Sequence, residues 1–241
     1  MARHMSFESE WWKSWDGQPL SVDSFDRVIA IGDVHGCAAA LSTLIDSIQP
    51  VHQDLIVMLG DYIDRGPDSK GVIDQVLSLT TRCHVMPLIG NHETMLLQGL
   101  DELVFRDFWL SFGGKETLAS YGGEIEQIPP EHIDFMRSCH KFFETDTTAF
   151  IHANYQPNAP FANQDEQVAF WLHLSEYVPA AHVSGKRVIV GHTPQKSGEI
   201  LDMGHLVGID THCFGNGYLT AMDISSNQVW QADKTGELRV N

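Results

Sequence analysis

The sequence predicts an α/β fold with a largely parallel sheet, and three observations support this prediction. Short apolar segments rich in β-branched residues recur along the chain, first at Val28–Ile31, Leu55–Leu59 and Val85–Ile89. Between them lie segments with apolar residues at helical spacing, and a glycine follows each strand. Strand, helix and strand in succession are typical of parallel sheets with right-handed crossovers.

The first two strand–helix units can be justified residue by residue. The strand Val28–Ile31 ends at Gly32, and the helix after it ends before Pro50. Asp68 is a suitable cap for the second helix. Each helix has one apolar stripe that can pack on a sheet. The stripe residues are Leu41, Leu44, Ile45 and Ile48 in the first helix, and Val72, Ile73, Val76, Leu77 and Leu79 in the second.

The alternation of predicted strands and helices is interrupted between residues 94 and about 144. This stretch is helical in pattern and rich in aromatic residues, and Pro129–Pro130 opens its last short helix. We therefore predict a helical cap inserted into the domain. Strands resume at Thr148–Ile151 and Arg187–Val190, and the tail from Leu206 alternates strands with turns.

The remaining organisation is simple. Residues 27–241 are predicted to form one domain, preceded by an arm over residues 1–26 that contains Trp11, Trp12 and Trp15. Such aromatic clusters usually pack against the body of the protein, although an exposed partner-binding patch is the alternative.

Composition excludes several classes of protein. With 15 Lys and Arg against 32 Asp and Glu, the formal net charge is −17, which disfavours binding to nucleic acid. No apolar run is long enough to span a membrane, and no secretory leader is evident. The four cysteines are scattered, so we expect reduced thiols in a cytoplasmic protein, with surface disulfides as the alternative.

Polar residues that can bind metals follow five apolar strands. Asp33 and His35 follow the first, Asp61 the second, and Asn91 the third; two further histidines, His152 and His192, follow the strands near 150 and 190. Because ligands bind at the carboxyl ends of strands in open α/β sheets, these side chains should converge. Imidazole with carboxylate suits Mn, Fe or Zn, and an Asn carbonyl can complete the shell.

The motifs resemble those of the phosphoprotein phosphatase (PPP) branch of the calcineurin-like metallophosphoesterases. The matching segments are Gly32-Asp33-Val34-His35-Gly36, Gly60-Asp61-Tyr62-Ile63-Asp64-Arg65-Gly66, Gly90-Asn91-His92-Glu93, His152-Ala153 and Gly191-His192. The resemblance covers most of the chain from Arg27 to about Asp223. It implies a four-layer α/β/β/α sandwich with a helical cap insertion, and it is closest to small bacterial serine/threonine phosphatases and diadenosine tetraphosphatases.

The resemblance also implies roles for individual residues. Two divalent cations, Mn²⁺ first and Fe or Zn as alternatives, would be held by six ligands. His92 would protonate the leaving oxygen with Asp64 orienting it, and Arg65 would grip the phosphoryl oxygens. The implied metal ligands are Asp33, His35, Asp61, Asn91, His152 and His192.

One departure from the family pattern concerns phosphate binding. Many bacterial members carry a second arginine in a Trp-x-Arg segment, where this chain has Trp171-Leu172-His173. Arg187 directly precedes a strand and is expected to point away from the site. His173 is a candidate substitute, and an ordinary packed or surface histidine is the alternative.

Three hypotheses about function follow. The first is hydrolysis of phosphomonoesters, above all phosphoserine and phosphothreonine in proteins, by in-line attack of a metal-bound hydroxide. The second is hydrolysis of dinucleoside polyphosphates, with a nucleoside pocket formed by aromatic residues of the cap, although packing is the favoured use of those residues. The third is a binding module without activity, which the complete set of ligands disfavours. Partners would be a phosphorylated protein or a small phosphoester. The cap aromatics concerned are Phe105, Trp109, Phe112 and Tyr121.

Overall fold

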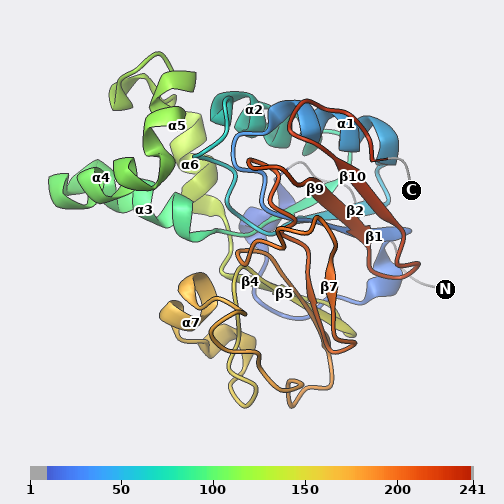
Figure 1. The fold of residues 1–241 in the computed structure, drawn as a ribbon. Coiled ribbons are helices and arrows are strands. Elements are labelled where there is room, and N and C mark those ends of the chain that lie inside the picture. Colours follow the sequence, from blue (N-terminus) through green and yellow to red (C-terminus); the bar gives the residue numbers. More distant parts are fainter. Residues whose placement is uncertain (1–9, 240–241) are drawn as a thin grey trace.

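The computed structural model describes residues 10–239 of the chain, which form two mixed β-sheets with helices around them (Figure 1). The strands are β1 Arg27–Ile31, β2 Asp54–Met58, β3 His84–Pro87, β4 Phe142–Glu144, β5 Thr148–Ile151, β6 Arg187–Val190, β7 Leu201–Asp202, β8 Leu206–Gly208, β9 Leu219–Asp223 and β10 Val229–Ala232. The α-helices are α1 Ala38–Ile48, α2 Ser69–Leu79, α3 Asn91–Asp101, α4 Leu103–Trp109, α5 Lys115–Ser120, α6 Pro130–Ser138 and α7 Glu166–Trp171.

The predicted parallel strands are divided between the two sheets. The first sheet has the order β10-β9-β1-β2-β3, and the second has the order β4-β5-β6-β8-β7. In the first, β1, β2 and β3 are parallel, β9 pairs antiparallel with β1, and β10 pairs antiparallel with β9. In the second, β5, β6 and β8 are parallel between antiparallel edges. The expectation of largely parallel pairing therefore holds for the side of the first sheet that contains β1, β2 and β3 and for the middle of the second sheet, but not for the remaining pairs.

The predicted strand–helix units are confirmed, and local chemistry explains their limits. The side chain of Asp68 accepts a hydrogen bond from the backbone N–H of Gly71 at 2.8 Å, which caps α2. Helix α1 ends where Gln49 adopts a left-handed conformation, one residue before Pro50. Both helices bury their apolar stripes, and they cover the outer face of the first sheet (Figure 1).

Alternation along the second sheet explains why the sheets pack face to face. Successive side chains of a strand point to opposite faces. Phe150, Ile189 and Val207 therefore enter the main core with the first sheet. Their neighbours, such as Ile151 and Val190, join a smaller core with residues of α7 and the segment after β5. The order of layers is helices, sheet, sheet and a thin outer layer that includes α7, which confirms the predicted sandwich.

Helices α3 to α6 form a lobe beside the sheets, in the stretch predicted to be the cap (Figure 1). The helices extend from Asn91 to Ser138, and β4 at the end of the predicted range is a strand of the second sheet. Within the lobe Trp109 and Tyr121 are buried, whereas Phe105 and Phe112 are exposed. Packing is therefore the use of two of the four cap aromatics.

The described part of the tryptophan-rich arm packs on the body. Trp12 is fully buried, and its indole donates to Ser138 Oγ at 3.2 Å. Its carbonyl accepts a hydrogen bond from His140 Nε2 at 2.6 Å, and the ring of Trp15 lies edge-on to that of His140. The first nine residues of the predicted arm lie outside the described residues.

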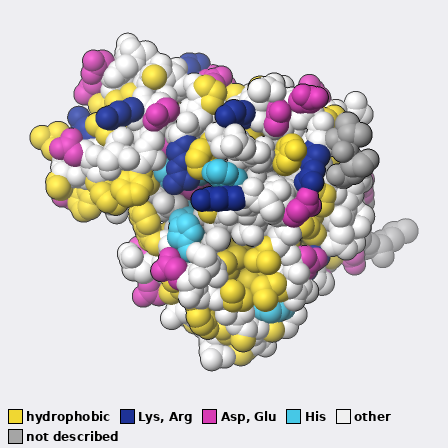
Figure 2. Space-filling model, in the orientation of Figure 1, with side chains coloured by type: hydrophobic (Ala, Val, Ile, Leu, Met, Phe, Trp, Pro, Cys, Tyr) yellow, Lys and Arg dark blue, Asp and Glu magenta, His cyan; other side chains and the backbone are white. Residues whose placement is uncertain are grey.

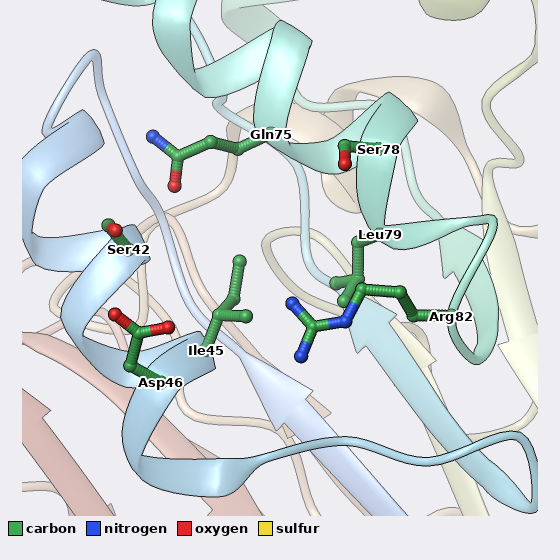
Figure 3. A pocket seen from close by; sticks show the side chains of 7 residues that line it. All are labelled: Ser42, Ile45, Asp46, Gln75, Ser78, Leu79 and Arg82. Carbon is green, nitrogen blue, oxygen red and sulfur yellow. The ribbon is translucent and has the colours of Figure 1, made fainter.

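Two surface features carry no part of the predicted site. Among residues 10–239, no helix has the length and apolar character needed to cross a membrane. A pocket of about 130 Å³ opens between α1 and α2, and Asp46, Gln75 and Arg82 point toward it (Figure 3). Its lining comes from the C-terminal parts of these helices, and therefore lies away from the carboxyl ends of the strands.

We predict that Trp12→Ala lowers the free energy of unfolding by about 3–5 kcal/mol, because it leaves a large cavity and removes the hydrogen bond to Ser138 Oγ. Urea denaturation would measure the change. Met203→Ala removes a side chain that is 44% exposed and serves as control; its effect should stay within about 0.5 kcal/mol. Equal losses in both variants would contradict the packing role of the arm.

Candidate metal centre and active site

The polar residues that follow the parallel strands converge between the two sheets. Asp33 follows β1, Asp61 follows β2 and Asn91 begins α3 directly after β3, all from the first sheet. His152 and His192 follow β5 and β6 of the second sheet. All five side chains are buried or nearly so. Sequence positions more than 150 residues apart thus meet at one place, as the strand-end pattern predicts.

The Asp61 carboxylate lies between two groups of donors. Its Oδ2 is 3.4 Å from His35 Nε2, and its Oδ1 is 3.5 Å from His152 Nε2. Donor atoms of His35, Asp61 and His92 lie within 4.8 Å of one another, as do those of Asp61, His152 and His192. Asp61 belongs to both groups, which is the position that a bridging carboxylate requires.

Asn91 and Asp33 extend these groups. Asn91 Oδ1 lies 3.0 Å from His152 Nε2 and 3.1 Å from His192 Nδ1. Asp33 Oδ2 accepts the backbone N–H of His192 at 2.9 Å. Among the described residues Asp33 Oδ1 has no hydrogen-bond partner. Asp33 is not part of either compact group, but its free oxygen is buried beside them.

Backbone carbonyls orient the histidine rings. His35 Nδ1 bonds to the Ile63 carbonyl at 2.9 Å, and His152 Nδ1 bonds to the Leu59 carbonyl at 2.7 Å. Each contact places the proton on Nδ1 and leaves Nε2 as a lone-pair donor toward Asp61. Burial lowers the pKa of His35 and His152, which favours the neutral ring that a metal needs.

Strained backbone is concentrated at this site. His35, Asp61, Asp64, Arg65 and His192 all have φ between 44° and 72°, a region that side chains other than glycine enter at a cost. Two glycines allow the backbone to approach the Asp61 and Asp33 carboxylates closely. A Cβ at Gly90 would lie 2.1 Å from Asp61 Oδ1, and a Cβ at Gly191 would lie 2.0 Å from Asp33 Oδ1.

His92 and Asp64 form a fully buried pair held by the cap. His92 Nδ1 lies 2.6 Å from Asp64 Oδ2. Asp64 also accepts hydrogen bonds from the Trp109 indole at 2.9 Å and from Thr117 Oγ1 at 2.6 Å. Burial lowers the pKa of His92, but the charge of Asp61 and the bond to Asp64 outweigh it and raise the pKa above its ordinary value. Among the described residues, His92 Nε2 has no partner, so it is free to serve a ligand.

Arg65 lies beside the first donor group. Its Nη1 is 3.1 Å from His35 Nε2, and its guanidinium lies over the Phe214 ring at 4.9 Å. The Phe214 ring also contacts the His35 ring edge-on at 5.1 Å. In the space-filling view, histidine and cationic side chains lie side by side in the middle of this face of the acidic molecule (Figure 2).

His173 and Arg187, the residues considered in relation to the missing second phosphate-binding arginine, differ in their position relative to the site. The His173 ring lies 4.4 Å from the ring of His192, at the edge of the centre. Arg187 donates to Asp202 at 3.0 Å and to Asn227 at 2.7 Å, and therefore turns away from the site as expected.

Sequence reasoning missed four residues that shape the site. Trp109 and Thr117 hold Asp64, Phe214 supports Arg65, and Asp210 is a buried carboxylate near Asp61. Of these four residues, only Asp210 could have been identified from the sequence. It follows the buried strand β8 within two residues, just as the predicted ligands follow their own strands. The others depend on contacts between distant segments.

The donor set fits divalent cations. Burial, together with the nearby charges of Asp210 and Asp61, raises the pKa of Asp33, and burial raises that of Asp210 to about 7. Clustered buried carboxylates with free oxygens are unfavourable unless cations compensate them. Nitrogen and oxygen donors without thiolate suit Mn, Fe or Zn.

The family assignment agrees with this geometry. The family model described as calcineurin-like phosphoesterase matches residues 26–215, well over half of the chain. The chain therefore belongs to the calcineurin-like phosphoesterase family, whose membership implies divalent metal ions, and the resemblance found in the motifs is confirmed.

Proteins similar to this chain include a dinucleoside tetraphosphatase and protein phosphatases. The chain is 25% identical to the asymmetrical bis(5'-nucleosyl)-tetraphosphatase PrpE of Geobacillus thermodenitrificans, over 80% of this chain and 88% of that protein. It is 35% identical to serine/threonine-protein phosphatase 1 of Salmonella typhimurium, over 40% of this chain and 43% of that protein. A structure of a cold-active protein-tyrosine phosphatase from a Shewanella species has a TM-score of 0.68 at 18% identity, covering 98% of this chain and 85% of that one.

We predict that Trp109→Phe lowers the free energy of unfolding by about 1–3 kcal/mol, because Asp64 loses a buried donor while most of the ring volume remains. Urea denaturation would measure it. Phe112→Leu, in the exposed part of the same lobe, is the control and should have little effect. Unchanged stability of Trp109→Phe would contradict the importance of this hydrogen bond.

Proposed function

We propose that the chain hydrolyses phosphomonoesters at a pair of divalent cations, with phosphoserine and phosphothreonine in proteins as the preferred substrates. One observation carries the proposal: two donor groups share Asp61, and His92, which is a member of the first group, is paired with the buried carboxylate of Asp64. Asp33, His35 and Asp61 would hold the first cation, and Asp61, Asn91, His152 and His192 the second. Mn²⁺ is the proposed metal, because it accepts both imidazole and carboxylate ligands.

Bound cations in such a pair supply Lewis-acid charge and lower the pKa of a bound water to about 7. The chain's own groups bind and orient the ester. Arg65 presents a planar guanidinium, suited to two phosphoryl oxygens, and its stacking on Phe214 limits its motion. His173, at the edge of the centre, is proposed as a weaker second contact to phosphate.

His92 is the proposed general acid. Asp64 fixes its Nδ1, so the proton for the leaving oxygen is held at the free Nε2. An alkoxide leaving group depends strongly on such protonation, whereas a nucleotide phosphate leaves readily without it. The hydrogen bonds by which the cap holds Asp64 therefore favour a substrate that is an ester of an alcohol, such as phosphoserine or phosphothreonine.

Hydrolysis of dinucleoside polyphosphates is the second candidate. The likeness to PrpE extends over four-fifths of the chain, and a pocket of about 390 Å³ between the cap and α7 is lined in part by Phe105, Phe108 and Trp171. Its lining contains Glu166 and neither Lys nor Arg. A substrate with several phosphates is poorly matched to such a pocket, and this ranks the candidate second.

A binding module without activity is the third hypothesis. Such a protein would be expected to have lost ligands or the acid. In this chain every ligand named by the motifs, and His92, lies at the convergence of the strands. This supports an active enzyme.

We predict that His92→Asn lowers kcat by about 10²–10⁴-fold while two metal ions stay bound, because only the general acid is removed. Phosphatase assays and elemental analysis of the same sample would measure both. His205→Asn, whose ring bonds to the Pro179 carbonyl, is the control and should keep full activity. Wild-type turnover in His92→Asn would remove His92 from this role.

For Asp61→Asn we predict loss of metal as well as of activity, since the shared carboxylate would lose its charge. Elemental analysis after dialysis should give fewer than two ions per chain. Full metal content with normal turnover would contradict a bridging role for Asp61.

The two substrate classes can be compared directly. With Mn²⁺ present, we predict that kcat/KM for a phosphothreonine peptide exceeds that for diadenosine tetraphosphate. The reverse order would make dinucleoside polyphosphate hydrolysis the better proposal.

A further inference from the structure

Asp210 lies between the segments that carry the proposed metal donors. It follows β8, and the preceding residue, Ile209, donates its N–H to the Val190 carbonyl at 2.9 Å. A Cβ at Gly32 would lie 2.6 Å from the Ile209 carbonyl oxygen, so no side chain fits between this segment and the end of β1. The backbone of Asp210 is thus held against the residues that precede Asp33 and His192.

The Asp210 carboxylate is buried and only half satisfied. The residue is 2% exposed, and Oδ1 accepts the backbone N–H of His212 at 2.9 Å. Among the residues that the structure describes, Oδ2 has no hydrogen-bond partner, and neither does Asp33 Oδ1. The turn at His212 needs one oxygen of Asp210, so it does not account for the other.

The surroundings of Asp210 make the unpaired oxygen costly. The charges of Asp33 and Asp61 act on it, and Arg65 is the cation whose charge opposes them. The guanidinium of Arg65 is already in contact with His35 and Phe214. A buried carboxylate left unpaired destabilises a protein unless positive charge compensates it.

We propose that Asp210 is part of the metal centre as an outer carboxylate, whose charge and free Oδ2 stabilise the cations without belonging to the six-residue donor set. Outer groups of this kind orient ligands and tune affinity. The inference rests on the proposed dinuclear site and adds to it a residue that the motifs do not name.

The test compares Asp210→Asn with wild type. Asn keeps the size of the side chain and the oxygen that accepts the His212 N–H, but removes the charge. Isothermal titration of metal-free full-length protein with Mn²⁺ should show about 10–100-fold weaker binding. At pH 8 the melting temperature of the metal-free variant should rise by about 2–4 °C, because one uncompensated buried charge is gone. Lower affinity together with higher metal-free stability is not expected of a purely structural residue.

Asp223→Asn is the matched control. Asp223 is also buried, on β9, but its oxygens accept hydrogen bonds from Ser225 and Ser226, and its charge acts on Arg27. This variant should melt at a lower temperature and bind Mn²⁺ like wild type. Asp210→Asn would overturn the proposal if it behaved in the same way. Wild-type protein that binds two Mn²⁺ ions while Asp210→Asn binds them equally well would refute this inference alone; wild-type protein that binds none would refute the dinuclear site as well.

Discussion

The burial of negative charge at the ends of the central strands is the constraint on which the site depends. Asp33, Asp61 and Asp210 are almost inaccessible to solvent, and the described structure leaves oxygens of two of them unpaired. Such an arrangement is unfavourable for folding by itself, and compensation by cations explains why it is tolerated. The left-handed backbone conformation of Asp61 and His35 contributes to this arrangement, because it turns these side chains toward a common point.

The cap helices make hydrogen bonds to residues of this centre and do not only lie beside it. Its helices contribute the indole of Trp109 and the hydroxyl of Thr117 to the carboxylate of Asp64, which in turn holds His92. A chain of buried hydrogen bonds therefore runs from the lobe to the imidazole of His92, within the first donor group. Changes in cap packing can reach His92 without touching any of the metal donors.

The likeness to both a dinucleoside tetraphosphatase and protein phosphatases leaves the class of phosphate ester open. The metal donors come from strand ends that any member of the fold can present, whereas the walls around them come from the cap, α7 and the segment near Phe214. These walls vary with loops and short helices, which tolerate change better than the strands. We therefore expect preference among phosphate esters to depend on these walls more than on the strand motifs.

The amino-acid sequence by itself determined most of the strands, though not β4 or β7, together with the first two helices and the positions of the predicted donors. These features are local: apolar runs, a cap at Asp68 and polar residues directly after strands at Asp33, Asp61 and His192. Only the tertiary structure decided that the strands divide into two sheets, that Trp109 and Thr117 hold Asp64, and that Asp210 joins the acidic cluster. Those outcomes depend on packing between segments far apart in the chain, and neither spacing nor periodicity encodes such contacts.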